Sequence, residues 1–274
     1  MTILASPSQA IGIFDSGIGG LTIAKAIKKE LPKEHIVYFG DTIHLPYGDK
    51  TGESIKYFAE KIVDFLLQNN CKIIVIACNS ASAVATKLLE QTYKNKIAII
   101  NVIDPTIDYV LKLDAVKKVG LIGTKRTVGS GVYARKFKKR CPEVSLYSKA
   151  TPLLAPMIEE GFFDNNISKT VIHSYLANHH LQNIDTLILG CTHYPLINKE
   201  IQAYYNGKVR VVDSSVVTAL KVKASLQKSN LLLKEKSKEG DHFYVSEYTP
   251  SFARASKLFF SKQIKLEEVK LFNQ

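Results

Sequence analysis

The sequence predicts an α/β protein of two similar α/β domains, with mainly parallel sheets that face each other across a cleft. Short apolar runs rich in β-branched residues recur along the 274 residues, and most precede stretches with helical spacing. The runs IIVIA and LIL do not alternate with polar residues, as expected of strands buried on both faces. Strands that alternate with helices in this way form parallel sheets covered by helices.

Eight segments have the composition of strands. In chain order they span residues 11–14, 35–40, 73–77, 97–102, 119–123, 144–148, 186–190 and 209–213. Between them, the stretch 54–69 places Ile55, Phe58, Ile62, Phe65 and Leu66 on one helix face. After residue 213 we expect a helix at 216–227, a lysine-rich exposed turn at 234–240 and two short elements. The ending IKLEEVKLF suits an edge strand, which we expect to dock on the first domain.

A weak internal repeat divides the chain into two halves. Cys78 lies 63 residues after Asp15, and Cys191 lies 67 residues after Thr124, each directly beyond a predicted strand. Ligands of α/β proteins bind beyond the carboxyl ends of strands, so the two halves are expected to carry their cysteines to one cleft. The predicted first domain is 1–101 with 214–274, which carries Asp15 and Cys78, and the second is 102–213, which carries Glu159, Cys191 and His193.

The segment IGIFDSGIGGLTIA at 11–24 joins a strand to a helix that starts near Leu21. Its glycines permit a tight turn, and the helix start favours an anion. The spacing nearly matches the dinucleotide fingerprint G-x-G-x-x-G, with Asp41 as the ribose ligand in that alternative. Thr22 stands at the third glycine position, however, and the Asp15 carboxylate would repel a cofactor phosphate. A nucleotide site is disfavoured but stays open as an alternative.

A second segment, YFGDTIHLPYG at 38–48, ends a strand in an acidic residue and a Pro-Tyr-Gly turn. By itself this pattern is typical of a rigid surface loop. Alternatively, Tyr47 and the backbone near Gly48 grip a small ligand at the same edge of the sheet.

The four cysteines contain no C-x-x-C pair, which argues against a zinc ribbon and provides no disulfide framework. Cys71 and Cys141 lie at element boundaries and are expected to be structural. Cys78 and Cys191 each follow a buried strand and precede polar residues, in ACNSASA and LGCTHYP. Helix N-terminal amides and a neighbouring acid or imidazole activate a thiol, so the matching contexts favour two reactive cysteines over two small buried hydrophobes.

A Ser/His/Asp hydrolase based on Ser16 and His193 is another alternative, but the sequence lacks the G-x-S-x-G elbow of such enzymes.

Basic residues outnumber acidic ones by 37 to 25, a net charge of +12, which raises a nucleic-acid-binding or regulatory protein as an alternative of a different class. Of the basic residues 32 are lysine and only 5 arginine, whereas base recognition favours arginine. The densest cluster, KFKKR at 136–140, is expected to be a solvated helix face. The first ten residues lack the pattern of a signal peptide, and no apolar run approaches the roughly 18 residues of a membrane span, so a cytoplasmic protein without membrane contact is expected.

Together the motifs resemble the glutamate racemase family of bacterial cell-wall synthesis. The matching stretches, in order between residues 15 and 195, are DSGIGGLT, GDTIHLPYG, ACNSASA, LIGT, PMIEEG and LGCTHYP. Their combination is highly specific. The sequence departs from the family at Ser80, where threonine usually follows Cys-Asn, but serine keeps the hydroxyl.

The resemblance implies cofactor-independent racemisation of L-glutamate to D-glutamate by a base on one face of Cα and a proton donor on the other. It implies no metal and no pyridoxal phosphate, a small-molecule substrate, and a homodimer. A racemase of aspartate or another amino acid is the alternative within the class. The implied catalytic residues are Cys78 assisted by Asp15, and Cys191 assisted by His193, with Glu159 (or, alternatively, Glu160) tuning His193. The implied binding residues are Asp15, Ser16, Pro46, Tyr47, Gly48, Asn79, Ser80, Thr124, Thr192 and His193.

Overall fold

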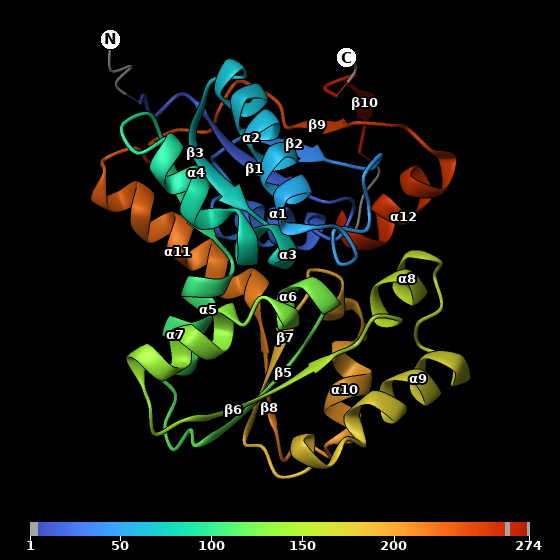
Figure 1. The fold of residues 1–274 in the computed structure, drawn as a ribbon. Coiled ribbons are helices and arrows are strands. Elements are labelled where there is room, and N and C mark those ends of the chain that lie inside the picture. The colour runs from blue at the N-terminus through green and yellow to red at the C-terminus, as the bar shows by residue number, and fades with distance from the viewer. Residues whose placement is uncertain (1–4, 261–263, 273–274) are drawn as a thin grey trace.

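The computed structural model describes residues 5–260 and 264–272, which form two parallel sheets covered by helices. Figure 1 shows one sheet above the other, with both chain ends on the upper half. The upper sheet has the strand order β10-β9-β2-β1-β3-β4, and the lower sheet has the order β6-β5-β7-β8. All strand pairs are parallel, so the predicted α/β class is confirmed.

Each of the eight predicted strands is present within two residues of its predicted ends, and the last two strands belong to the C-terminal segment. The strands are β1 (Ala10–Asp15), β2 (Ile36–Gly40), β3 (Cys71–Ile76), β4 (Ala98–Asn101), β5 (Lys118–Gly123), β6 (Ser145–Ala150), β7 (Thr186–Gly190), β8 (Arg210–Asp213), β9 (His242–Val245) and β10 (Leu266–Glu268). β10 lies at the sheet edge, as predicted for the ending IKLEEVKLF.

The helices occupy the predicted connections. They are α1 (Leu21–Glu30), α2 (Gly52–Gln68), α3 (Asn79–Val84), α4 (Thr86–Thr92), α5 (Ile103–Val110), α6 (Lys125–Gly129), α7 (Val132–Arg140), α8 (Leu154–Glu159), α9 (Asn166–Leu176), α10 (Asn198–Tyr204), α11 (Ser214–Lys228) and α12 (Pro250–Phe260), with 3-10 turns η1 (His179–Leu181) and η2 (Tyr194–Ile197). Within the described residues, no helix is long and apolar enough to cross a bilayer.

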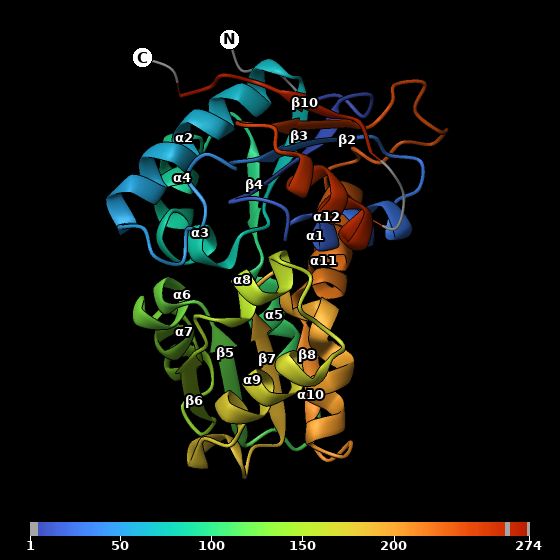
Figure 2. The same ribbon diagram turned by 90° about the vertical axis from the view of Figure 1, so that its right-hand side faces the viewer.

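Burial on both faces of the sheet explains the unbroken apolar run at residues 73–76 of strand β3. Ile73 and Val75 belong to the core that includes α1, whereas Ile74 and Ile76 belong to a second core that includes α2. Successive strand residues point to opposite faces, so a strand covered on both sides is apolar at each of positions 73–76. Figure 2 shows α2 on one face of the upper sheet and α1, α11 and α12 on the other.

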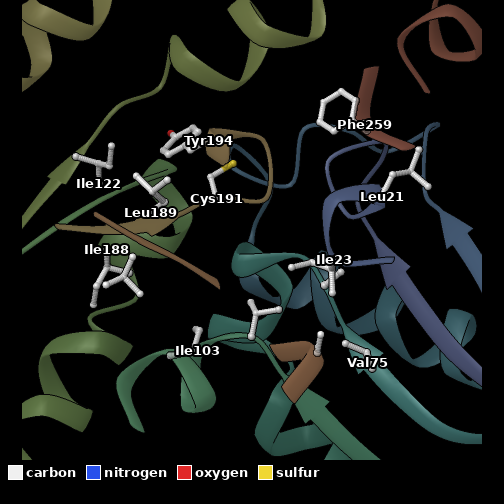
Figure 3. Packing of buried hydrophobic residues seen from close by; sticks show 14 of the residues in the cluster. Leu21, Ile23, Val75, Ile103, Ile122, Ile188, Leu189, Cys191, Tyr194 and Phe259 are labelled. Atoms are coloured by element: carbon white, nitrogen blue, oxygen red, sulfur yellow. The ribbon is translucent and has the colours of Figure 1, made fainter. Parts of the chain in front are cut away.

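One apolar core continues from the upper sheet into the lower one. Leu21 and Ile23 of α1, Val75 of β3, Ile103 of α5 and Ile188 of β7 belong to a single buried cluster. Figure 3 shows these side chains lying along the junction of the two sheets. The two halves are therefore packed against each other.

The C-terminal segment returns to the upper sheet, as predicted, and a buried ion pair helps to hold it there. Lys72 and Glu34 meet at 2.6 Å with side chains 0% and 2% exposed. The Lys72 ammonium also donates to the Leu231 carbonyl, and the Leu233 amide donates to Glu34. Removing such charges from water is costly unless they are paired and hydrogen-bonded, so these contacts fix the path of the segment.

The strand orders place two equivalent switch points near each other. In the upper sheet β1 lies between β2 and β3, and in the lower sheet β5 lies between β6 and β7. At such a point the connections leave in opposite directions, which opens a binding site beyond the carboxyl ends of the two central strands. Asp15 and Cys78 lie at this position in the upper sheet, and Thr124 and Cys191 lie there in the lower sheet. The predicted similarity of the two halves is thus confirmed.

Candidate active site

Asp15 ends strand β1 and is fully buried. One carboxylate oxygen, Oδ2, accepts a hydrogen bond of 3.1 Å from the Gly17 amide, whereas Oδ1 has no partner among the described residues. Burial raises the pKa of Asp15, against the opposing effects of the His193 charge and of amide hydrogen bonds. A buried carboxyl with a raised pKa and a free oxygen is suited to exchange protons.

Cys78 follows strand β3 and is the N-terminal cap of α3. Its sulfur accepts from the Ala81 amide at 3.5 Å and lies 3.7 Å from the Ser16 hydroxyl. Burial, followed by the Asp15 charge, raises the pKa of Cys78 to about 12, although the Ala81 amide and the Ser16 hydroxyl oppose this. Cys78 is therefore held as a protonated thiol near neutral pH.

Cys191 directly follows strand β7, and its partner is an imidazole. Its sulfur lies 3.5 Å from Nδ1 of His193, and Nε2 of His193 lies 2.8 Å from the Glu159 carboxylate. Burial lowers the pKa of His193, but the charges of Cys191 and Glu159 and the contacts with both outweigh burial and raise that pKa well above its ordinary value. The imidazole is thus held protonated beside the sulfur. Glu159 thus contacts His193, whereas Glu160, the alternative, is exposed.

The two cysteine groups meet where the upper and lower halves touch. The Thr22 hydroxyl donates to the Thr192 carbonyl at 3.0 Å, which links α1 to the Cys191 loop. A Cβ atom on Gly19 would lie 2.3 Å from Oγ1 of Thr192 and 2.6 Å from Nδ1 of His193. Only glycine permits this approach. Besides burial and Asp15, a charge on Cys191 also raises the pKa of Cys78. Figure 3 shows Cys191 at this junction, between Leu189 and Tyr194 on one side and Leu21 and Phe259 on the other.

Three predicted binding segments come together on the other side of Cys78. The hydroxyls of Ser80 and Thr124 lie 2.8 Å apart, across the two halves. The Gly48 carbonyl accepts from the Arg126 amide at 3.1 Å, and a Cβ atom on Gly48 would lie 3.0 Å from Cβ of Thr124. Although the family usually has threonine at position 80, Ser80 still provides a hydroxyl for this contact.

Neither Pro46 nor Tyr47 of the predicted binding turn offers a free polar side chain to a ligand. Pro46 is exposed, and its carbonyl accepts from the Asp49 amide within the turn. Tyr47 is fully buried, and its hydroxyl donates to Asp41 at 2.6 Å. Burial, followed by the charge of Asp41, raises the pKa of Tyr47 well above its ordinary value. The hydroxyl is already engaged, so the backbone of this turn is the part left to hold a ligand.

Asp41 is buried inside its own network and does not reach a ribose. Besides Tyr47, it receives the Ser246 hydroxyl at 3.0 Å and Nδ1 of His44 at 2.9 Å. In the nucleotide-site alternative Asp41 is the ribose ligand, but Asp41 is 0% exposed, so this alternative has no acidic ligand. Instead, Asp41 ties the 41–48 turn to strand β9 of the C-terminal segment.

Sequence reasoning missed Tyr133 and Phe259. The Tyr133 hydroxyl donates to Oδ1 of Asn79 at 3.0 Å, and the Phe259 ring lies edge-on to His193 at 5.6 Å between centroids. Both side chains are 1% exposed. In sequence each resembles any apolar residue of an amphipathic helix, so no local signal distinguishes them from ordinary core residues.

The Glu159 contact predicts a shift in pH dependence. In Glu159→Gln the negative charge beside His193 is lost, so the raised pKa of His193 falls and the ring loses its proton at lower pH. We expect the alkaline limb of kcat to move to lower pH by about one unit or more. Profiles of kcat against pH for both proteins measure this shift. Glu160→Gln is the matched control, because Glu160 is exposed beside it, and an unmoved limb in Glu159→Gln would contradict the assignment.

The assembled groups suit proton transfer on two sides of one bound atom. Each half supplies a thiol with its own auxiliary group, a carboxyl for Cys78 and an imidazole for Cys191. Among residues 5–260 and 264–272, no group of three or more His, Cys, Asp or Glu side chains is arranged to hold a metal ion. Hydroxyls and amides instead border the thiols, and such groups bind carboxylates without burying a further charge.

Known proteins are similar to this chain over nearly its whole length. The sequence model of the Asp/Glu/Hydantoin racemase family matches residues 20–222. A glutamate racemase of Geobacter metallireducens is 40% identical over 254 residues, which cover 92% of this chain and 93% of that protein. A glutamate racemase of Chlorobium phaeobacteroides is 38% identical over 95% of each chain.

Solved structures agree with the sequence relatives. The glutamate racemase of Francisella tularensis, in complex with D-glutamate, superimposes with a TM-score of 0.90 at 37% identity, covering 97% of this chain and 99% of that one. The glutamate racemase of Thermus thermophilus gives a TM-score of 0.86 at 36% identity, covering 97% and 98%. The resemblance that the motifs indicated is confirmed: the chain belongs to the Asp/Glu/Hydantoin racemase family and, within it, to the glutamate racemases.

Proposed function

We propose that this enzyme interconverts L- and D-glutamate for peptidoglycan synthesis, with Cys78 and Cys191 as the two acid–base groups. The observation that supports the pair is their placement beyond equivalent strands of opposing sheets, where each thiol has a separate auxiliary group. Inversion at Cα requires proton removal from one face and proton delivery to the other. Two halves that each carry one thiol provide this geometry.

In one direction the Cys191 thiolate takes the Cα proton, so the C–H bond breaks and an S–H bond forms. Cys78, whose raised pKa keeps it protonated, delivers its proton to the opposite face of the carbanion. In the reverse direction Cys78 gives its proton to the adjacent Asp15 carboxylate and takes the Cα proton. Cys191, which receives a proton from His193, delivers it to the opposite face. His193 stands beside Cys191 as the protonated partner that Glu159 maintains.

The substrate carboxylates and the amino group are held by polar groups around the thiols. The set consists of the backbone amides of Tyr47 and Gly48, the Asn79 side-chain amide, and the hydroxyls of Ser16, Ser80, Thr124 and Thr192. These donors also stabilise the negative charge that develops on the α-carboxylate as the Cα proton leaves.

The test is a racemisation assay with purified protein and no added cofactor. Circular dichroism should show L-glutamate and D-glutamate each converted to the racemate, while aspartate turns over much more slowly. Conversion of aspartate as fast as glutamate would change the substrate assignment, and absence of any turnover would refute the activity. The experiment thereby separates glutamate from the other amino acids that the motifs leave open.

The enzyme is further proposed to act in the cytoplasm as a homodimer. All four cysteines are unpaired, which suits a reducing compartment and the chemistry of free thiols. Tyr109 of α5 and Val216 and Leu220 of α11 are exposed apolar side chains on helices that pack against each other. Sedimentation at micromolar concentration should give twice the chain mass, whereas a mass of 30.5 kDa would contradict the dimer.

A further inference from the structure

Only one end of the buried Asn79 side-chain amide is hydrogen-bonded. The side chain is 2% exposed, and its oxygen Oδ1 accepts the Tyr133 hydroxyl at 3.0 Å. The nitrogen Nδ2 has no partner among the described residues. Buried amide groups are rarely left without hydrogen bonds, because desolvation of an unpaired donor is costly. Within the described residues, the two N–H donors of this amide, next to Cys78 in the chain, have no acceptor.

Tyr133 contacts the oxygen end of the amide and leaves the nitrogen end without a partner among the described residues. A neutral tyrosine hydroxyl donates one hydrogen bond, and Oδ1 of Asn79 is the acceptor that receives it. Burial, followed by the charge of Asp104, raises the pKa of Tyr133, so the hydroxyl stays protonated across the working pH range. Were the amide turned over, Nδ2 would donate to the tyrosine oxygen and the atom left without a partner would be Oδ1, which cannot donate to a carboxylate.

We propose that Tyr133 is a positioning residue for glutamate binding, which locks the Asn79 amide with its N–H donors toward a carboxylate of the substrate. This inference rests on the proposed function, because it names how one binding residue of the same site is oriented. Tyr133 does not touch the substrate in this scheme and acts only through Asn79.

Tyr133 and Asn79 belong to different halves of the molecule, so the orientation of the Asn79 amide depends on how the two halves pack. Tyr133 belongs to α7, after strand β5 of the lower sheet, whereas Asn79 starts α3, after strand β3 of the upper sheet. Helix α7 is fixed against α5 by Lys136 and Arg140, which both contact Asp104, at 2.6 and 3.0 Å respectively. The donor end of Asn79 is therefore set only while α7 lies against the Cys78 loop.

The primary variant is Tyr133→Phe, which removes the hydroxyl and keeps the buried ring. We expect KM for both glutamate enantiomers to rise about 5- to 10-fold, as for the loss of one hydrogen bond that orders a ligand contact. We expect kcat and its pH profile to stay within about 2-fold of wild type, because the thiols and their partners are untouched. An unchanged KM would overturn the proposal.

A double-mutant cycle distinguishes orientation of Asn79 from a general loss of packing. Tyr133→Phe should raise KM by no more than about 2-fold when Asn79 is already alanine, because no amide is left to orient. An equal factor in both backgrounds would overturn the proposal. Asn79→Asp supplies a second arm: it keeps an acceptor for Tyr133 but loses the N–H donors, so its KM should exceed that of Tyr133→Phe.

Tyr205→Phe is the matched control for folding. Its hydroxyl is also buried in the lower half, where it donates to the Leu181 carbonyl at 3.2 Å, away from the thiols and from Asn79. Its KM should equal that of wild type. If the wild-type protein racemises glutamate and Tyr133→Phe has the same KM, only this inference is refuted. If the wild-type protein does not racemise glutamate, the proposed function is refuted.

Discussion

Replacing either Cys78 or Cys191 with serine is expected to lower kcat/KM for glutamate racemisation about 10³-fold or more, in both directions. A positioned acid–base group contributes about 10²–10⁴-fold to a rate, and a serine hydroxyl neither loses nor gives a proton readily near neutral pH. Each variant keeps one competent thiol, but inversion needs both in every turnover. The loss should therefore be similar whichever cysteine is replaced.

Initial rates from L- and D-glutamate, followed by circular dichroism, measure this effect. In deuterium oxide the wild-type product should carry solvent deuterium at Cα, because the donating thiol exchanges with solvent before it protonates the carbanion. Cys141→Ser is the matched control, since Cys141 is half-buried and its sulfur contacts Glu143. Full activity in Cys78→Ser or Cys191→Ser would reject the two-thiol assignment.

Gly19→Ala is expected to lower kcat about 10²-fold without unfolding the protein. The added Cβ would lie 2.5 Å from Cε1 and 2.6 Å from Nδ1 of His193, distances that real Cβ atoms do not tolerate. His193 is held between Cys191 and Glu159, so the ring moves only by losing one of these contacts. Displacement of a catalytic group by about 1 Å commonly costs about 10²-fold in rate.

Gly129→Ala is the control for this substitution. Gly129 lies in α6, and a Cβ atom there meets nothing within 4 Å, so activity should be unchanged. Melting curves of the two variants and wild type separate a local displacement from unfolding. A Gly19→Ala enzyme with wild-type kcat would show that the two halves can separate slightly and still place His193.

The α/β class and all eight predicted strands could be read from the sequence because strand formation here depends on local composition. Ile73 to Ile76 are apolar at every position, and only a strand covered on both faces requires this. The candidate thiols were also predictable, because Cys78 and Cys191 follow such strands directly and parallel strands present their carboxyl ends on one edge. The boundaries 101/102 and 213/214 between the two domains stay predictions.

Contacts between distant segments escaped prediction. Tyr133 and Asn79 are separated by 54 residues, and Asp41 meets Ser246 across 205 residues. The Tyr47 hydroxyl donates to Asp41, a pairing that depends on the fold of the turn and has no signal in the sequence. The excess of basic over acidic residues can be counted from the sequence, but the ion pairs that these residues form cannot. In the densest basic cluster, Lys136 and Arg140 are both paired with Asp104.

Local residue patterns thus specify the layered sheets and the chemistry available at the end of each strand. They do not specify which side chains face each other between the halves, because side-chain direction and distance depend on how two separately formed sheets pack. That packing brings Gly19 against His193, joins Ser80 to Thr124 and orients the Asn79 amide through Tyr133. Two cysteines in equivalent sequence contexts become parts of one site only when the two halves pack together, with Cys191 in the core that runs through α1 and α5 and Cys78 in the core on the α2 side of the upper sheet.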